Sequence, residues 1–307
     1  MKYRDQIFHN LQEDAMKQNQ SSSSAAGVAA MRAIESQKPE AERICYDPYA
    51  RALVNTVLPA ALFYLTKLMI DSGLYDRMAP GATAFIAVRE RYIDDYLIAS
   101  LKEGLEQVVI LGAGFDTRPY RIAGIEKTHV FEVDHPATQE AKLKGLKKVI
   151  DPLPAHVTFV PLDFNTQTLG EGLSAKGYSE KGKTLFIWQG VTYFLTAEGV
   201  DNTLDFIARQ SGPGSSVIFD YFYTETLSDT ANGYGKSLRR AQRLSNEVYM
   251  FGIDRGQIGP FLTQRGFSDV NSLTLEDLKR RYFAGPNAGR RVPAGIEIAS
   301  ARVPSAK

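Results

Sequence analysis

The sequence has one cysteine, few histidines and no long apolar run. The single cysteine, Cys45, excludes an intramolecular disulfide and a zinc site built from cysteines. The four histidines show no HxxxH or HExxH spacing, so we expect no catalytic metal. The most apolar stretch, Val57 to Ile70, is interrupted by Pro59, Thr66 and Lys67. It is shorter than the roughly 20 residues that a membrane span requires, so we expect no membrane segment.

An excess of charge of one sign is lacking as well. The 307 residues hold 36 Lys+Arg and 35 Asp+Glu, which leaves a formal net charge of +1. Without a clustered basic surplus, we expect no nucleic-acid partner. The polar N-terminus lacks the apolar core of a secretory signal, which favours a cytoplasmic protein. With 44% hydrophobic residues, the chain is long enough for one large α/β domain or two modest ones.

What the chain does have is an ordered change of pattern that predicts three parts. Residues 1–24 are polar, end in a serine run and are expected to form a flexible tail. Residues 25–105 have helical periodicity and predict a helical lid. Within it, Arg89 borders the apolar stripe of the segment from Ala82 to Leu105, whereas Asp94 points elsewhere. Residues 106–307 are expected to form the core.

In this third part, short β-rich runs alternate with helical stretches. Such alternation gives right-handed βαβ units, so the sequence predicts an α/β fold with a mostly parallel sheet. Thr196 is a plausible N-cap for one of the helices. The predicted strands are QVVIL, THVFEV, HVTFVPL, TLFIWQ and SSVIFDYF, followed by two closing strands at Phe267–Leu273 and Gly295–Ala301.

The first three predicted strands each end in a residue type suited to holding a nucleoside. The first ends in Gly112-Ala113-Gly114, a turn that lets backbone approach a ligand. The second ends at Asp134, which can accept hydrogen bonds from ribose hydroxyls. The third ends at Asp163 and Phe164, a carboxylate and an aromatic ring that can hold an adenine. Each feature alone is a common structural device, but the three together favour a nucleoside pocket.

The residues after the glycine turn help to choose between two nucleoside cofactors. A dinucleotide fingerprint needs a small third residue, where this chain has Thr117. Asp116 places negative charge where phosphates would lie at a helix start. A cofactor without phosphate and with a positive centre fits better, and S-adenosylmethionine is such a cofactor. A nicotinamide-dependent oxidoreductase remains the alternative.

Longer motifs carry a family resemblance. The segments VVILGAGFDTRPYRI, VFEVDHP, VPLDF and WQGVTYFL occur in this order, preceded by SSAAGVAAMRAIES, DPYARALV and RERYIDDYL. Together they resemble the leucine carboxyl methyltransferase family and, more closely, its bacterial and fungal branch of S-adenosylmethionine-dependent O-methyltransferases. The resemblance covers the chain from about Ser24 to its end. It implies a Rossmann-like, class I methyltransferase sheet with a helical N-terminal lid.

The resemblance also implies roles for single residues. Arg89 matches the arginine that pairs with the cofactor carboxylate, and Gly112, in the turn it shares with Gly114, matches the glycine that approaches the methionine portion. Asp134 matches the ribose-binding acid, and Asp163 with Phe164 matches the adenine-binding pair. Arg32 is either a second partner for the carboxylate or part of a solvated helix face.

One position departs from the family pattern. Where the family usually has glutamate at the end of the fourth strand, this chain has Gln189. Its amide can accept a hydrogen bond near the cofactor ammonium and the methyl-transfer centre but supplies no charge. Tyr193 is a second candidate near that centre, although it and Tyr221–Tyr223 are more simply explained by packing. Arg118 either faces the acceptor or braces a helix start.

These observations predict an S-adenosylmethionine-dependent O-methyltransferase acting on a carboxylate or hydroxyl of a small organic acceptor. A carboxylate is ionised at neutral pH and needs no general base, which agrees with the absence of a conspicuous His or Cys nucleophile. Two further alternatives remain open. One is a protein C-terminal carboxyl methyltransferase acting on a phosphatase tail, and the other is a non-catalytic nucleoside-binding scaffold.

Overall fold

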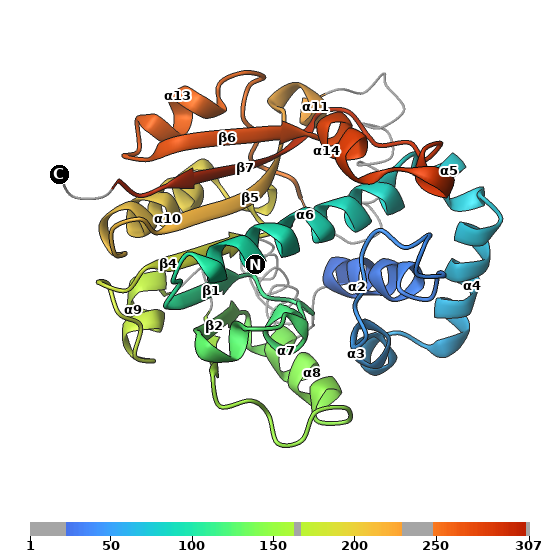
Figure 1. The fold of residues 1–307 in the computed structure, drawn as a ribbon, viewed down its shortest axis with the longest axis horizontal. Coiled ribbons are helices and arrows are strands. Elements are labelled where there is room, and N and C mark those ends of the chain that lie inside the picture. The colour runs from blue at the N-terminus through green and yellow to red at the C-terminus, as the bar shows by residue number, and fades with distance from the viewer. Residues whose placement is uncertain (1–22, 163–166, 229–247, 305–307) are drawn as a thin grey trace, which may run out of the picture.

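The computed structural model describes residues 23–162, 167–228 and 248–304. They form a seven-stranded sheet with helices on both faces (Figure 1). The strand order is β3-β2-β1-β4-β5-β7-β6, in which β1 to β5 are parallel and β7 runs antiparallel to both of its neighbours. The predicted α/β class with a mostly parallel sheet is confirmed. The strands are β1 (Gln107–Leu111), β2 (His129–Asp134), β3 (Val157–Pro161), β4 (Thr184–Trp188), β5 (Ser216–Phe222), β6 (Ser268–Thr274) and β7 (Ile296–Arg302).

The central strands β1, β4 and β5 are buried along their whole length because helices cover both faces of the sheet. In β1, Val108 and Ile110 face one layer, while Val109 and Leu111 face the other. The first layer contains α6 (Ala82–Lys102) and α14 (Leu275–Tyr282). The opposite layer contains α9 (Leu169–Ser174), α10 (Ala197–Arg209) and α13 (Ile258–Thr263).

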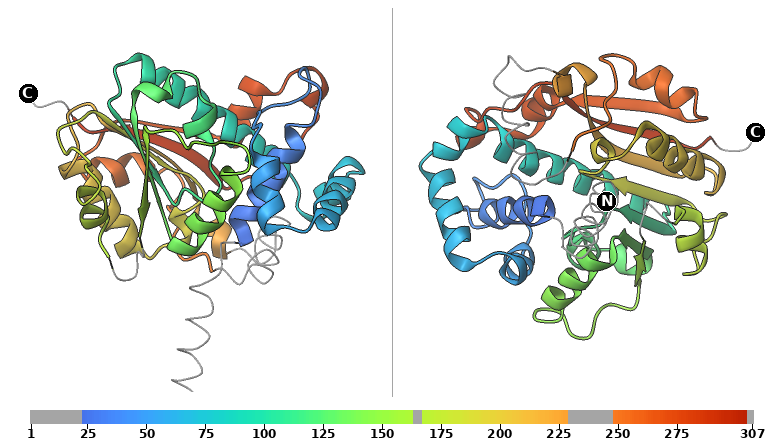
Figure 2. Two further views of the ribbon diagram at one scale, coloured as in Figure 1. Left: turned by 90° about the horizontal axis from the view of Figure 1, so that it is seen from below. Right: turned by 180° about the vertical axis from the view of Figure 1, so that it is seen from behind.

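The described residues before β1, from Ser23 on, are mostly helical, as the pattern of residues 25–105 predicts. The helices are α2 (Ser23–Glu35), α3 (Ala50–Val57), α4 (Ala60–Asp71), α5 (Leu74–Met78) and α6. Helices α2 to α5 lie beside the sheet (Figure 2), whereas α6 packs on one of its faces. A separate apolar cluster joins α2 and α3 to Phe63 of α4, to Phe115 after β1 and to Leu146 of α8 (Pro136–Leu146). The N-terminal helices are therefore anchored on the loop that follows β1.

The predicted boundaries hold to within a few residues. Each predicted strand starts and ends within one or two residues of the observed one, and Thr196 caps α10 by accepting a hydrogen bond from the Gly199 N–H at 3.1 Å. Helix α2 begins at Ser23, and the rest of the predicted tail lies outside the described residues. The remaining short elements are α7 (Arg118–Arg121), α11 (Thr224–Ser228), η1 (Ile125–Lys127), η2 (Thr192–Phe194) and η3 (Gly285–Asn287).

Candidate active site

The glycine turn after β1 is the tightest point of the carboxyl edge of the sheet. Gly112 and Gly114 have φ angles of 63° and 46°, a region that favours glycine. A Cβ atom at position 112 would lie 2.4 Å from Cγ2 of Val191, in the loop after β4. At position 114 it would lie 3.3 Å from Cβ of Ala25 in α2. The turn therefore brings bare backbone to an edge bordered by two other segments.

Replacing Gly112 with alanine should destabilise the fold, because the side chain meets both an unfavourable φ and Val191. Gly124 is a matched control, since its φ is 91° but a Cβ there would have nothing within 4 Å. We expect G124A to cost about 1–3 kcal/mol from backbone strain alone. G112A should cost about 1–3 kcal/mol more from the added contact. Urea unfolding of the two variants measures the difference, and equal losses would contradict the contact.

Asp134 ends β2 next to this turn. Its carboxylate accepts hydrogen bonds from the backbone N–H of Gly114 and, at 2.6 Å, from that of His135. Burial raises the pKa of the Asp134 carboxyl, although these backbone donors oppose the rise. Each carboxylate oxygen keeps a second lone pair, so two further donors, such as a pair of ribose hydroxyls, can be accommodated. The ribose role of Asp134 stays a prediction, while its position beside Gly114 is as the sequence predicted.

Arg89 of α6 reaches the carboxyl edge of β4 and β5. It is buried, and its Nη1 donates to Oδ2 of Asp220 at 2.6 Å. Oδ1 of Asp220 accepts from the Gly190 N–H, also at 2.6 Å. The Tyr193 hydroxyl shares a hydrogen bond with Arg89, and burial raises the pKa of this phenol well above its usual range. Arg89 is thus held by one carboxylate and one phenol.

Gln189, directly after β4, is oriented by an acid that the sequence did not single out. Its Nε2 donates to Oε2 of Glu90 at 2.8 Å. Its Oε1 then turns away from Glu90 and is buried without a hydrogen-bond partner among the described residues. In the part of the chain that the structure describes, Nε of Arg89 is likewise buried and unpartnered.

These two unpartnered atoms test whether the site fits the amino-acid end of S-adenosylmethionine. Arg89 Nε is a donor and Gln189 Oε1 an acceptor, and both come to the same edge of the sheet. A buried polar atom left unpaired costs roughly 1–3 kcal/mol, so each favours a ligand group of the opposite kind. A carboxylate satisfies the donor and an ammonium satisfies the acceptor. The residues present fit a zwitterionic amino-acid group.

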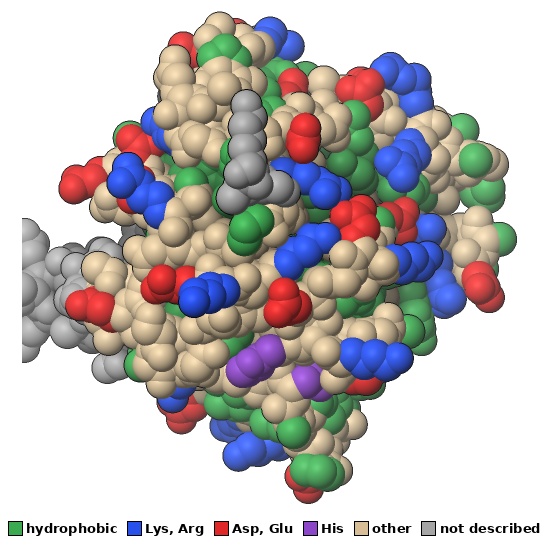
Figure 3. Space-filling view, turned by 60° about the vertical axis from the view of Figure 1, so that its left-hand side comes forward, with side chains coloured by type: hydrophobic (Ala, Val, Ile, Leu, Met, Phe, Trp, Pro, Cys, Tyr) green, Lys and Arg blue, Asp and Glu red, His purple; other side chains and the backbone are tan. Residues whose placement is uncertain are grey.

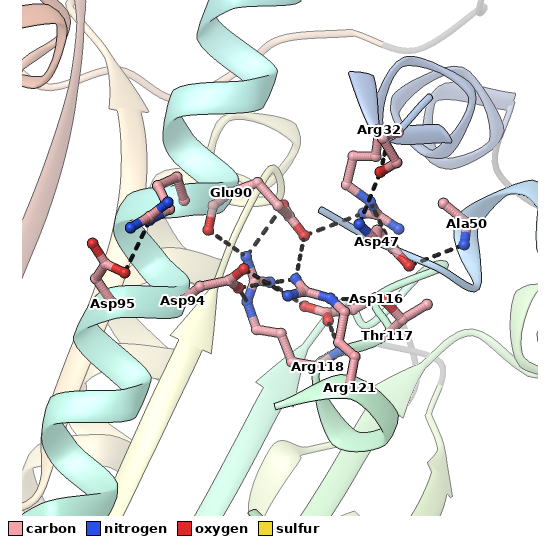
Figure 4. A network of polar contacts seen from close by, with 12 residues as sticks. Arg32, Asp47, Ala50, Glu90, Asp94, Asp95, Asp116, Thr117, Arg118 and Arg121 are labelled. Carbon is pink, nitrogen blue, oxygen red and sulfur yellow. Dashed lines mark hydrogen bonds and ion pairs between the residues drawn. The ribbon is translucent and has the colours of Figure 1, made fainter. Parts of the chain in front are cut away.

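Behind Gln189 lies a buried network of charged side chains (Figure 4). Arg118 contacts three carboxylates: Glu90 at 3.2 Å, Asp94 at 2.7 Å, and Asp116. Arg121 pairs with Glu90 at 3.2 Å and with Asp94 at 2.6 Å. Although burial raises the pKa of Glu90, the guanidiniums of Arg118, Arg32 and Arg121 hold it well below the usual range of a carboxyl.

The network settles two residues that the sequence left open. Arg118 is fully buried, and Asp116 accepts from its backbone N–H at 2.8 Å, so Arg118 braces the start of α7. Arg32 does not lie on a solvated helix face, because it is 4% exposed and its Nε pairs with Asp47 at 3.1 Å. It also donates to the carbonyl of Phe115 and lies 3.7 Å from Glu90.

Two sequence interpretations need correction. Asp94 does not point away from the core; the arginines of α7 bury it against α6. Asp116 does not present an unpaired charge at the helix start, since Arg118 neutralises it, so it offers little argument against a phosphate. Both corrections involve Arg118 of α7, whose guanidinium pairs with Asp116 close by in the chain and also reaches Asp94 of α6.

Other candidates have simpler places. Tyr221 and Tyr223 are buried, and their hydroxyls donate to Glu297 of β7, which confirms that they pack. His135 caps α8, its Nδ1 accepting from the Ala137 N–H at 3.3 Å. Asp163 and Phe164, the predicted adenine-binding pair, lie outside the described residues.

Sequence reasoning missed Asp220 and Glu90. Asp220 carried a usable signal, because it interrupts the apolar run at the end of the fifth strand, as Asp134 does in the second. Glu90 carried none, since a charged residue beside Arg89 on a helix is ordinarily solvent-exposed.

The surface adds no single-signed patch on the face shown in Figure 3, where Lys and Arg side chains alternate with Asp and Glu over the described residues. Among those residues, no helix is both long enough and apolar enough to cross a bilayer.

A sheet of this order, with a glycine turn after β1 and a carboxylate at the end of β2, has the topology of the class I methyltransferase fold. A solved structure with the same fold is a DUF574 family protein from Streptomyces avermitilis. It is 12% identical, with a TM-score of 0.56 over 90% of this chain and 97% of the other.

Sequence comparison gives the family. The profile of leucine carboxyl methyltransferase matches residues 25–208. A Mycolicibacterium smegmatis protein is 34% identical over 270 residues, covering 85% of this chain and 86% of the relative. A protein from Mycobacterium sp. (strain JLS) is 29% identical over 293 residues, covering 91% of each. Both relatives are named as S-adenosyl-L-methionine-dependent methyltransferases.

The chain belongs to the leucine carboxyl methyltransferase family, and it is an S-adenosyl-L-methionine-dependent methyltransferase. The family match decides against the nicotinamide alternative.

Proposed function

We propose that the protein transfers a methyl group to an oxygen of a small organic acceptor, with a carboxylate as the favoured oxygen and a hydroxyl as the second choice. When bound, S-adenosyl-L-methionine would supply an electrophilic methyl group: the O–CH₃ bond would form as the C–S bond breaks, and S-adenosylhomocysteine would leave with that electron pair on its sulfur. Arg89 and Gln189 would hold the amino-acid end of the cofactor, Gly112 and Gly114 would bring backbone to it, and Asp134 would hold the ribose. Asp163 and Phe164 would hold the adenine.

Arg32 would act indirectly, through its contacts with Glu90 and with the carbonyl of Phe115 in the loop after β1.

The observation that carries the choice of acceptor is that Asp220, the acid that contacts Arg89 and Gly190 among the described residues, is already engaged. Asp220 accepts from Arg89 and from the Gly190 N–H. Burial keeps the pKa of the Tyr193 phenol far above neutral pH, so Tyr193 is protonated there and is no base. A hydroxyl acceptor requires a base to take its proton, whereas a carboxylate is ionised at neutral pH without help. The edge therefore favours catalysis by positioning and by exclusion of water.

The chemical behaviour of the product distinguishes the two oxygens. The purified protein is incubated with methyl-labelled S-adenosyl-L-methionine and a panel of aliphatic acids, aromatic acids and phenols, and the products are then treated with dilute alkali. A methyl ester releases labelled methanol, whereas a methyl ether keeps its label. We expect alkali-labile label on at least one acid and none on phenols. Alkali-stable products alone would contradict a carboxylate acceptor, and label on nitrogen or carbon would contradict O-methylation altogether.

The same assay tests the remaining alternatives. A phosphatase catalytic subunit added in place of the small acids reports on C-terminal carboxyl methylation of a protein. A protein that binds S-adenosyl-L-methionine in calorimetry but transfers no methyl group to any acid, phenol or phosphatase subunit would support the scaffold alternative. We expect transfer to a small acid to exceed transfer to the phosphatase subunit.

A further inference from the structure

The buried network next to Gln189 has more carboxylates than guanidiniums. It contains Arg32, Arg118 and Arg121, against Asp47, Glu90, Asp94 and Asp116. Within this cluster one negative charge is left over. A buried charge without a partner is costly, so such a cluster favours a cation nearby.

Gln189 is the side chain that connects this cluster with the candidate cofactor site. Glu90 is 0% exposed, and its Oε2 receives the Gln189 Nε2 hydrogen bond at 2.8 Å. Because the –NH₂ group is committed to Glu90, the amide cannot exchange its two ends without placing its oxygen against a carboxylate. Oε1 is the atom left over, buried and unpartnered among the described residues.

We propose that Glu90 is a positioning residue for cofactor binding: its carboxylate accepts the Gln189 Nε2 hydrogen bond and so fixes the amide with Oε1 turned to accept from the cofactor ammonium. The proposal rests on the proposed cofactor contacts of Gln189. A hydrogen bond to a charged acceptor polarises the amide and makes its oxygen a stronger acceptor. Gln189 itself carries no negative charge, so Glu90 supplies that charge from behind the Gln189 side chain.

The arrangement also explains how a glutamine serves at position 189. A second carboxylate there would lie within hydrogen-bonding distance of Glu90 and would raise the excess to two charges. Two carboxyls that close cannot both ionise without a large cost, so one would hold a proton. The amide avoids this conflict and keeps an acceptor in place.

The test is a charge exchange. Four proteins are compared by calorimetric titration with S-adenosyl-L-methionine and with S-adenosylhomocysteine: the wild type, E90Q, Q189E and the double variant E90Q/Q189E. We expect E90Q to weaken binding of both compounds at least tenfold, because both carry the ammonium. The double variant restores the total charge and should bind within threefold of the wild type or more tightly.

Asp94→Asn is the matched control: it removes the same unit of charge beside the same two arginines of α7, but among the described residues Asp94 makes no hydrogen bond to Gln189. We expect D94N to lower the melting temperature, as E90Q does, but to change affinity less than threefold. Equal loss of affinity in E90Q and D94N would overturn the proposal, because it would show a general structural effect. If E90Q does not fold, the double variant decides alone: a folded double variant that binds tenfold more weakly overturns the proposal.

The pH dependence of Q189E tests the adjacency of positions 90 and 189 on which the proposal depends. In this variant one carboxyl of the pair should have a pKa well above that of an ordinary glutamate. Its stabilising protonation is complete at low pH and is lost as pH rises through the raised pKa. We expect the melting temperature of Q189E, relative to the wild type, to fall between about pH 5 and pH 8, and a pH-independent difference would overturn the proposal.

Failure of the proposed function gives a different result. A wild type that binds S-adenosyl-L-methionine but methylates no oxygen contradicts O-methylation and leaves the Glu90 test intact. A folded wild type that binds neither compound contradicts the cofactor contacts and the positioning role together.

Discussion

Exchange of Arg89 for methionine together with Asp220 for asparagine should abolish most cofactor binding while leaving the protein folded. Removing Arg89 alone strands the buried Asp220 carboxylate, 131 residues away in sequence, and should cost about 3–5 kcal/mol of stability. Neutralising both partners removes that penalty, and the asparagine still offers an oxygen to the Gly190 N–H. The free energy of unfolding of the double variant should therefore lie within about 1–2 kcal/mol of the wild-type value.

In R89M/D220N the second substitution should restore stability but not the affinity for the cofactor. Loss of a hydrogen-bonded guanidinium from a carboxylate ligand costs about 1.5–3 kcal/mol, so S-adenosyl-L-methionine should bind about 10- to 100-fold more weakly to R89M/D220N. Asp220→Asn alone is the control: it keeps Arg89 and should retain the cofactor affinity of the wild type, or exceed it. Calorimetry on the three variants, with urea unfolding in parallel, measures both effects. An R89M/D220N protein that binds like the wild type would refute the assignment of Arg89.

Replacement of Arg118 by alanine should produce the largest loss of stability of any single change in the network. Its guanidinium contacts Glu90, Asp94 and Asp116, and all four side chains are buried. Leaving buried carboxylates without their cation costs about 3–5 kcal/mol, a large part of the 5–15 kcal/mol that holds most domains folded. We expect R118A to unfold at markedly lower urea concentration or to be recovered only at low temperature.

Replacement of Arg91 gives the comparison for the loss of stability. Arg91 lies on α6, the helix that also carries Glu90 and Asp94. Its Nε pairs with Asp95 at 3.1 Å, but the side chain is 49% exposed. Exposed pairs contribute about 0–1 kcal/mol, so R91A should unfold almost as the wild type does. A loss from R91A as large as that from R118A would show that burial of the network does not determine its contribution.

R118A should also change the acid sensitivity of the protein. The pKa of Glu90 is depressed in the folded state by Arg118, Arg32 and Arg121, against the opposing effect of burial. A depressed folded pKa contributes stability above the unfolded value, near 4.3, and that contribution is lost as pH falls below it. The stability of R118A should therefore fall less steeply than that of the wild type between about pH 5 and pH 3.

The sheet and the glycine turn could be read from the sequence because their causes are local. Apolar runs of five to seven residues separated by helical stretches leave few arrangements, and parallel strands bring their carboxyl ends to one edge. Gly112, Gly114 and Asp134 each lie at the end of such a run, so their meeting follows from the topology. Gln189 was singled out by its departure from the glutamate that the resembled family usually has there.

The charged partners could not be read, because burial of a charge depends on what lies across from it. The periodicity of α6 places Arg89 beside the apolar stripe and Asp94 off it, yet both are buried. Asp94 is covered by Arg121 of α7, and Arg89 is paired with Asp220 of β5. The sequence of α6 alone predicts neither neighbour.

The sequence by itself thus determined the class of fold and the edge of the sheet that carries the site, since both follow from residue types at strand ends, and its longer family motifs indicated the kind of cofactor. Only the tertiary structure decided how the site is charged. It paired Arg89 with Asp220, turned Asp94 inward, and placed Glu90 behind the Gln189 amide, because ion pairs between distant segments form where the packed helices bring them together.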